Sequence, residues 1–188
     1  MTAIWNNFAD GSKSLEYYAD VITKLGATTA SSSEEISGGL EKFASVAETV
    51  GLSYEYAASS LATIVAATRQ SEDTVGTGLR TLFARFEGFK IDPKSTLEDG
   101  ITLNKYSEAL AKMGVSILDS NGNLREMDEI LDDMGSRWDT LSEKEQIAVA
   151  QTVGGVRQYT NLIALMENWD TFKENVNTAR NSEGSLQE

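Results

Sequence analysis

Residues 72–87 read EDTVGTGLRTLFARFE, and the apolar positions of this stretch repeat with the period of an α-helix. The positions that share one helical face are Val75, Leu79, Leu82, Phe83 and Phe86. Ser71 precedes the stretch as an N-cap, and Glu72 and Asp73 place negative charge in the first turn, where the helix dipole favours it. The stretch therefore predicts an amphipathic helix that packs against a core, and Gly88 is predicted to end it.

The same helical period continues on both sides of this stretch. Ser32 and Ser142 are each followed three residues later by glutamate, which is the spacing of a capping box. Further helices are predicted at about residues 15–25, 33–50, 54–70, 103–113, 127–138, 143–153 and 159–176. Residues 89–100 contain the single proline and are predicted to form a loop. Gly154 and Gly155 are predicted to break the helix that Ser142 caps.

Between two of these helices, residues 115–131 read VSILDSNGNLREMDEIL. Asn121 and Gly122 stand in the middle, and both residue types tolerate the positive φ angles that a tight turn demands. The side chains expected to point inward are those of Val115, Ile117 and Leu124. The predicted fold class is mainly α: a compact multi-helix domain with one small β-hairpin at about residues 115–126.

The same stretch holds alternating oxygen donors, Asp119, Asn121 and Asn123, as calcium-binding loops do. An EF-hand loop needs glycine at its sixth position and a bidentate glutamate at its twelfth. Counted from Asp119, the glycine falls at position four and Ile130 at position twelve. The spacing therefore argues against calcium, and no metal-ligating residue is assigned.

The Gly-Thr-Gly sequence at Gly76, Thr77 and Gly78 could indicate a phosphate-binding loop. The dinucleotide fingerprint requires a third glycine and a preceding strand, and this sequence has neither. Small residues inside a helix are more typical of a place where another helix crosses closely. No cofactor-binding residue is predicted.

Two pairs of acidic residues are candidates for catalytic carboxylates: Asp132 with Asp133, and Glu143 with Glu145. A catalytic pair must converge in a cleft with separated pKa values. Adjacent helix positions point about 100° apart, so Asp132 and Asp133 are expected to diverge. Solvated helix surface is the favoured interpretation of both pairs, and no catalytic residue is assigned.

Composition excludes several kinds of site. The chain has 188 residues and a formal net charge of −13, with no cysteine and no histidine. Disulfides, thiolate zinc sites and the commonest general base are therefore missing. The negative charge argues against nucleic-acid binding through this segment, because phosphate neutralisation needs clustered Lys and Arg.

One short span is richer in basic residues than the rest of the chain. Its cations are Arg69, Arg80, Arg85, Lys90 and Lys94. They alternate with Glu72, Asp73, Glu87 and Asp92. This span could dock an acidic partner, but internal salt links are the favoured interpretation.

The order of these motifs carries more information than any one of them. Residues 68–90 read TRQSEDTVGTGLRTLFARFEGFK, and residues 103–170 read LNKYSEALAKMGVSILDSNGNLREMDEILDDMGSRWDTLSEKEQIAVAQTVGGVRQYTNLIALMENWD. This run resembles the core region of phage tail tape measure proteins over roughly residues 35–180. The matching elements, in order, are Thr77–Leu82, Met113–Arg125, Met127–Trp138, Leu141–Ala150, Gly155–Tyr159 and Leu162–Trp169.

The resemblance implies a structural, non-enzymatic role. Tape measure proteins occupy the lumen of the phage tail tube, set tail length during assembly and leave ahead of the DNA. The implied partners are other copies of the chain together with tail tube and tail-tip proteins, and no small-molecule substrate is implied. The implied locations are the tail lumen of the virion and, during assembly, the cytoplasm of the host bacterium.

The resemblance also suggests a division of the chain. Residues 1–31 would form an N-terminal helix and linker, and could be the end of a preceding rod. Residues 32–180 would be the core domain, followed by a polar tail at 181–188. The chain has neither a signal-peptide pattern nor an apolar run near the ~20 residues that span a bilayer, and it is expected to be a piece of a longer protein.

Two alternative functions remain open on the sequence. The first is a cell-wall-degrading module of a tail protein that uses carboxylates such as Asp133 and Glu143. The second is an unrelated helical adaptor domain. The apolar face of Leu162–Trp169 could contact a partner, or it could belong to the core of the domain.

Overall fold

The computed structural model describes residues 7–8 and 11–184 of the chain, and helices dominate that part. The first four named helices are α2 (Leu15–Thr28), α3 (Ser33–Val50), α4 (Tyr54–Thr68) and α5 (Glu72–Ile91). The next are α6 (Leu103–Ala111), α7 (Met127–Arg137), α8 (Glu143–Glu167) and α9 (Trp169–Arg180). A single 3-10 turn, Trp138–Thr140, joins α7 to the loop before α8. None of the helices in the described ranges is long and apolar enough to cross a membrane.

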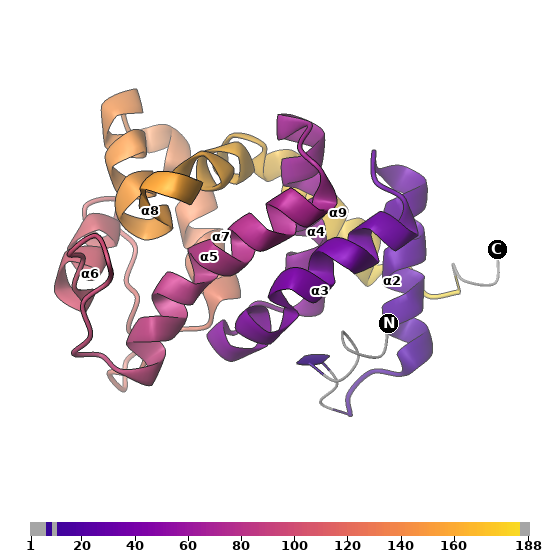
Figure 1. The fold of residues 1–188 in the computed structure, drawn as a ribbon, viewed down its shortest axis with the longest axis horizontal. Helices are drawn as coiled ribbons and strands as arrows, with labels where there is room; N and C mark the ends of the chain where they lie inside the picture. Colours follow the sequence, from indigo (N-terminus) through magenta and orange to yellow (C-terminus); the bar gives the residue numbers. More distant parts are fainter. Residues whose placement is uncertain (1–6, 9–10, 185–188) are drawn as a thin grey trace.

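Two helix pairs form the body of the fold. Helices α3 and α5 lie side by side across the front of Figure 1, and α4 and α9 pack together behind them. Helix α4 is buried along most of its length, from Tyr54 to Val65, and its small residues let its neighbours approach closely. Helix α2 covers one end of the pairs, and Val21, Ile22 and Leu25 bury its inner face. The proposed division of the chain at residue 31 stays a prediction.

The predicted helix caps at Ser32, Ser71 and Ser142 are confirmed. Ser32 and Ser142 each form a capping box with the glutamate three residues later, and Ser71 accepts a hydrogen bond from the backbone of Thr74. These side chains satisfy backbone N–H groups that have no partner within the helix. Gly51 ends α3 in the left-handed conformation, with a φ of 77°.

Two predicted helix ends are wrong. Gly88 does not end α5, which continues to Ile91 because buried Phe89 carries on the apolar face one turn after Phe86. The predicted closing helix at 159–176 is instead divided at Asn168 between α8 and α9. The predicted break at Gly155 is confirmed as a kink inside α8, where this residue has φ 79° and ψ 161°.

The predicted β-hairpin at about residues 115–126 is also wrong. The residues that the structure describes form no strand, and this segment contributes only an isolated antiparallel bridge between Leu118 and Leu124. Its extended arms are too short for a ladder, because Gly114 ends one side and α7 begins at Met127 on the other. A two-stranded ribbon of this length is marginal in water without further partners.

The core forms one continuous cluster, and the apolar face of Leu162–Trp169 belongs to it. Leu162 and Met166 are buried, and the ring of Trp169 stacks at a tilt on Phe172. Gly135 of α7 faces this ring so closely that an added Cβ atom would lie 2.1 Å from it. This face therefore contributes to folding and is not free for a partner.

Candidate functional site

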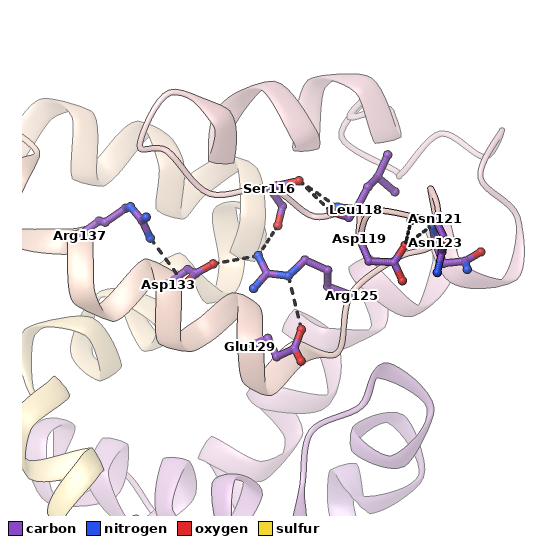
Figure 2. Close-up of polar contacts among 9 residues, drawn as sticks. All are labelled: Ser116, Leu118, Asp119, Asn121, Asn123, Arg125, Glu129, Asp133 and Arg137. Carbon is purple, nitrogen blue, oxygen red and sulfur yellow. Dashed lines mark hydrogen bonds and ion pairs between the residues drawn. The ribbon is translucent and has the colours of Figure 1, made fainter.

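The loop before α7 is held by a network of polar contacts, which Figure 2 shows. Oδ1 of Asp119 accepts hydrogen bonds from the backbone N–H groups of Asn121 and Asn123, at 2.8 and 3.0 Å. The backbone N–H of Asp119 donates to the carbonyl oxygen of Asn123, at 2.8 Å. A side chain therefore closes this turn, as aspartate commonly does when it bonds to the backbone just after it.

Arg125 anchors the loop to α7. Its Nη1 donates to the carbonyl oxygen of Ser116 at 2.7 Å and to Oδ2 of Asp133 at 2.8 Å. Its Nε lies 3.5 Å from Oε2 of Glu129, and Arg137 lies 3.5 Å from the second oxygen of Asp133. The hydrogen bond that Arg125 donates to Asp133 is the main cause that raises the pKa of Arg125 above its ordinary value.

The carboxylate of Asp119 serves the turn itself. Oδ1 of Asp119 is directed at two backbone donors, which leaves the turn organised around a hydrogen-bonded carboxylate. Among the described residues, no group of three or more acidic side chains is placed to hold a metal ion. The inward prediction for Val115 and Ile117 is confirmed, and Leu124 is partly buried.

The candidate catalytic carboxylates do not converge. Asp132 accepts hydrogen bonds from the hydroxyl of Tyr56, at 2.7 Å, and from Nζ of Lys173, at 3.1 Å. Asp133 instead faces Arg125 on the loop side of α7. Glu145 accepts from the backbone N–H of Ser142 at 3.0 Å, which lowers its pKa and gives it a capping role. These contacts are those of structural ion pairs and caps.

The Gly-Thr-Gly sequence is confirmed as a helix-crossing site. An added Cβ atom at Gly76 would lie 2.4 Å from the carbonyl oxygen of Gly39 on α3. On the other side of α5, a Cβ atom at Gly78 would lie 2.4 Å from Oε1 of Gln158 on α8. Both glycines lie inside a helix, away from any strand or free helix end.

The basic residues of the span around α5 have different surroundings. Arg85 extends to α8, where it donates to the carbonyl oxygens of Thr152 at 2.7 Å and Val153 at 3.1 Å, and it pairs with Asp99 at 3.0 Å. Arg85 therefore forms an internal salt link, which is the interpretation that the sequence favoured for these basic residues. Lys90 lies in the last turn of α5 and Lys94 lies in the loop that follows it, and both are exposed.

Comparison with protein families provides the deciding observation. Residues 1–155 match the family described as phage-related minor tail protein. The chain belongs to this family. No solved structure was found to match it.

Membership gives the chain a structural role in the phage tail and makes this minor tail protein a virion component that contacts other tail proteins. It replaces the interpretation of the chain as an adaptor domain unrelated to phage. The resemblance to phage tail proteins, inferred from the order of motifs, is thereby confirmed at the level of the minor tail protein family.

Two polar features of this minor tail protein were missed from its sequence. Asp128 accepts a hydrogen bond from the backbone N–H of Ser53 at 2.9 Å, and its own N–H donates to the carbonyl oxygen of Gly51. Burial raises the pKa of Asp128 to about 6, against the opposing effect of its bonds with Ser53. The second feature is the contact of Lys173 with Tyr56 and Asp132, which joins α4, α7 and α9. Neither has a local sequence signal, because each joins residues far apart in the chain.

Proposed function

We propose that this chain is a non-enzymatic structural segment of a tape measure protein, which sets tail length and takes part in tail assembly and DNA ejection. The observation that carries the proposal is the ordered run of motifs over residues 35–180, in a chain that belongs to the minor tail protein family. The polar contacts around Arg125, Arg85 and Asp132 join helices to one another, as expected of a structural domain.

The proposed place of the chain is a compact domain within a longer, rod-like protein. A measuring rod needs long continuous helices, whereas the helices here are interrupted at Gly51, Gly114 and Gly155. We infer that the domain sits in the lumen of the tail tube and contacts tail tube and tail-tip proteins and other copies of itself. During assembly it would be present in the cytoplasm of the host bacterium.

The test is proteomic. Tailed particles are purified from the source strain and digested, and the peptides Thr81–Arg85 and Gln158–Lys173 are quantified against a tube protein. We expect a few copies per tail, protected from trypsin in intact tails and cleaved once the tails are opened. Peptides confined to assembly intermediates would contradict the proposal and indicate a chaperone-like role.

The cell-wall-degrading alternative has its own test. Purified chain is incubated with peptidoglycan, and soluble fragments are measured for the parent and for Asp133→Asn and Glu143→Gln. We expect no release above a heat-treated control, since Asp133 faces two arginines and Glu143 lies at the first position of α8. Release that either variant abolishes would replace the structural assignment with an enzymatic one.

A further inference from the structure

Residues 119–123 and residues 97–101 form two surface turns with the same backbone geometry. In each turn the first residue donates its N–H to the carbonyl oxygen of the fifth, at 2.8 and 2.9 Å respectively. The carbonyl oxygen of the first residue accepts from the N–H of the fourth, at 3.1 and 2.8 Å. The fourth residue is glycine in both turns, Gly122 with φ 81° and Gly100 with φ 84°. The turns can therefore be compared through their side chains.

The residue before the glycine is Asn121 in one turn and Asp99 in the other. Asp99 is held on both oxygens: Oδ2 lies 3.0 Å from Nη2 of Arg85, and Oδ1 accepts from the backbone N–H of Ile101 at 3.4 Å. Asn121 is exposed, and no residue that the structure describes holds its side-chain amide by a hydrogen bond. The amide carbon of Asn121 is therefore free to turn towards the backbone nitrogen of the next residue.

Gly122 leaves the approach to Asn121 open. A Cβ atom at Gly122 would meet no atom beyond its chain neighbours within 4 Å, so the turn projects into solvent. Glycine also has no side chain that could shield its own nitrogen. Each of the other asparagines of the chain is followed by a residue with a side chain. Asn121 is therefore the asparagine whose amide is most open to attack by the following backbone nitrogen.

We propose that Asn121 is a site of spontaneous deamidation, and that the turn closed by Asp119 sets the rate of this reaction. The backbone nitrogen of Gly122 loses its proton and forms a bond to Cγ of Asn121. The bond from Cγ to the side-chain nitrogen breaks, and this nitrogen takes up a proton and leaves as ammonia. Water then opens the cyclic imide at either of its carbonyl carbons. The product at position 121 is aspartate or isoaspartate.

The contacts of Asp119 oppose this attack in the closed turn. The N–H of Gly122 donates to the carbonyl oxygen of Asp119, and Oδ1 of Asp119 accepts from the N–H of Asn121 at 2.8 Å (Figure 2). While these bonds are made, the nitrogen of Gly122 is engaged with a carbonyl oxygen and is not free to attack Cγ. The reaction therefore starts from conformations in which the loop has opened locally. Deamidation should be slower in the folded chain than in an unfolded peptide of the same sequence.

The products change the loop in two ways. Both add a carboxylate to the turn that already holds the carboxylate of Asp119, and like charges repel. Isoaspartate also lengthens the main chain by a carbon atom, so the bond from the N–H of Asp119 to the carbonyl oxygen of Asn123 can no longer form in the same register. The modified loop should therefore be less ordered. The inference goes beyond the proposed tail function and does not rest on it.

Peptide mass spectrometry on purified folded chain tests the proposal. The chain is aged in mildly alkaline buffer, and the tryptic peptide Met113–Arg125 is followed for conversion of an amide to a carboxyl group. Fragmentation that distinguishes isoaspartate from aspartate identifies the product. We expect conversion at Asn121 and none at Asn123, which lies in the same peptide but precedes Leu124. Asp99, in the matched turn, should form no isoaspartate.

Matched variants test the role of the turn. Asp119→Ala removes the carboxylate that accepts from the N–H of Asn121 and should speed the conversion by at least about threefold. Asp92→Ala removes a carboxylate that accepts from the backbone N–H of Lys94 at 3.0 Å in another loop, and should leave the rate unchanged. Thermal unfolding of each variant near that of the parent shows that the fold is intact. Asn121→Gln keeps an amide but would have to close a larger ring, and it should abolish the conversion.

An amide of Asn121 that survives as long as that of Asn123 overturns the proposal, as does an equal rate of conversion in the parent and in Asp119→Ala. Because these measurements use purified chain, their failure is distinct from failure to find the peptides in tailed particles, which would contradict the proposed function itself.

Discussion

Gly39 of α3 and Gly76 of α5 lie against each other where the two helices cross. A Cβ atom on Gly76 would lie 2.4 Å from the carbonyl oxygen of Gly39, and one on Gly39 would lie 2.8 Å from the carbonyl oxygen of Glu72. Backbone atoms cannot move aside as the end of a flexible side chain can. The crossing therefore depends on glycine at both positions.

Gly76→Ala is expected to destabilise the fold by about 1–3 kcal/mol, because overpacking at the crossing outweighs the better helix propensity of alanine. Gly88→Ala is the matched control in the same helix. Its added Cβ atom would meet only Leu97, at 3.8 Å, so the control should gain up to about 1 kcal/mol. Urea unfolding followed by circular dichroism measures both. Equal stability of the two variants would contradict the close crossing.

Arg85→Gln is expected to cost about 1–3 kcal/mol of unfolding free energy. The substitution removes the donors to the carbonyl oxygens of Thr152 and Val153, which lie just before the kink at Gly155. Arg80→Gln removes the same charge from an exposed position of α5 and should change stability by less than about 0.5 kcal/mol. The same urea experiment compares them, and similar midpoints for the two variants would argue against this role of Arg85.

The helices could be predicted from the sequence because their signals are local. Ser32, Ser71 and Ser142 cap helices through residues three positions away, and the apolar period of α5 is visible within one stretch. The ends marked by glycine were less predictable. Gly51 does end a helix, whereas Gly88 lies inside one, since buried Phe89 extends the apolar face past it.

The polar loop was only partly predictable. The turn at Asn121 and Gly122 was found, but the sequence does not distinguish a strand ladder from a turn closed by the side chain of Asp119. The anchoring role of Arg125 depends on α7 folding back under the loop, which brings Asp133 within 2.8 Å. Arg125 lies in the loop and Asp133 lies on α7, so the spacing rules for residues on one helix do not predict this contact.

Arg125→Gln is expected to loosen the loop with a cost of about 1–2 kcal/mol, because the carbonyl of Ser116 and the carboxylate of Asp133 both lose a charged donor. Hydrogen exchange measured by NMR should speed up at the backbone amides of Asp119 and of the residue at position 125, which donate to the carbonyl oxygens of Asn123 and Ile117. Arg137→Gln is the control, since its contact with Asp133 is longer, at 3.5 Å, and more exposed. Unchanged exchange in Arg125→Gln would show that the Asp119 turn holds the loop alone.

Asp128 makes stability depend on pH. Burial raises its pKa from the ordinary value of 3.8 to about 6 in the folded chain, and the negative charges of Asp132 and Glu55 add to the effect. The folded state therefore holds this proton more tightly than the unfolded state. The stabilisation is complete below about pH 4 and is lost as the pH rises to about 6, with an upper bound of about 3 kcal/mol.

Asp128→Asn keeps an oxygen for the backbone N–H of Ser53 but has no charge to bury. Above pH 6 this variant should be more stable than the parent by about 1–3 kcal/mol, and the difference should disappear towards pH 4. Glu129→Gln removes a negative charge from an exposed position of the same helical turn and controls for the change in net charge. The measurement is the urea midpoint of unfolding of the parent and both variants from pH 4 to pH 8. A difference between Asp128→Asn and the parent that is constant across this range would mean that Asp128 titrates alike in the folded and unfolded chain.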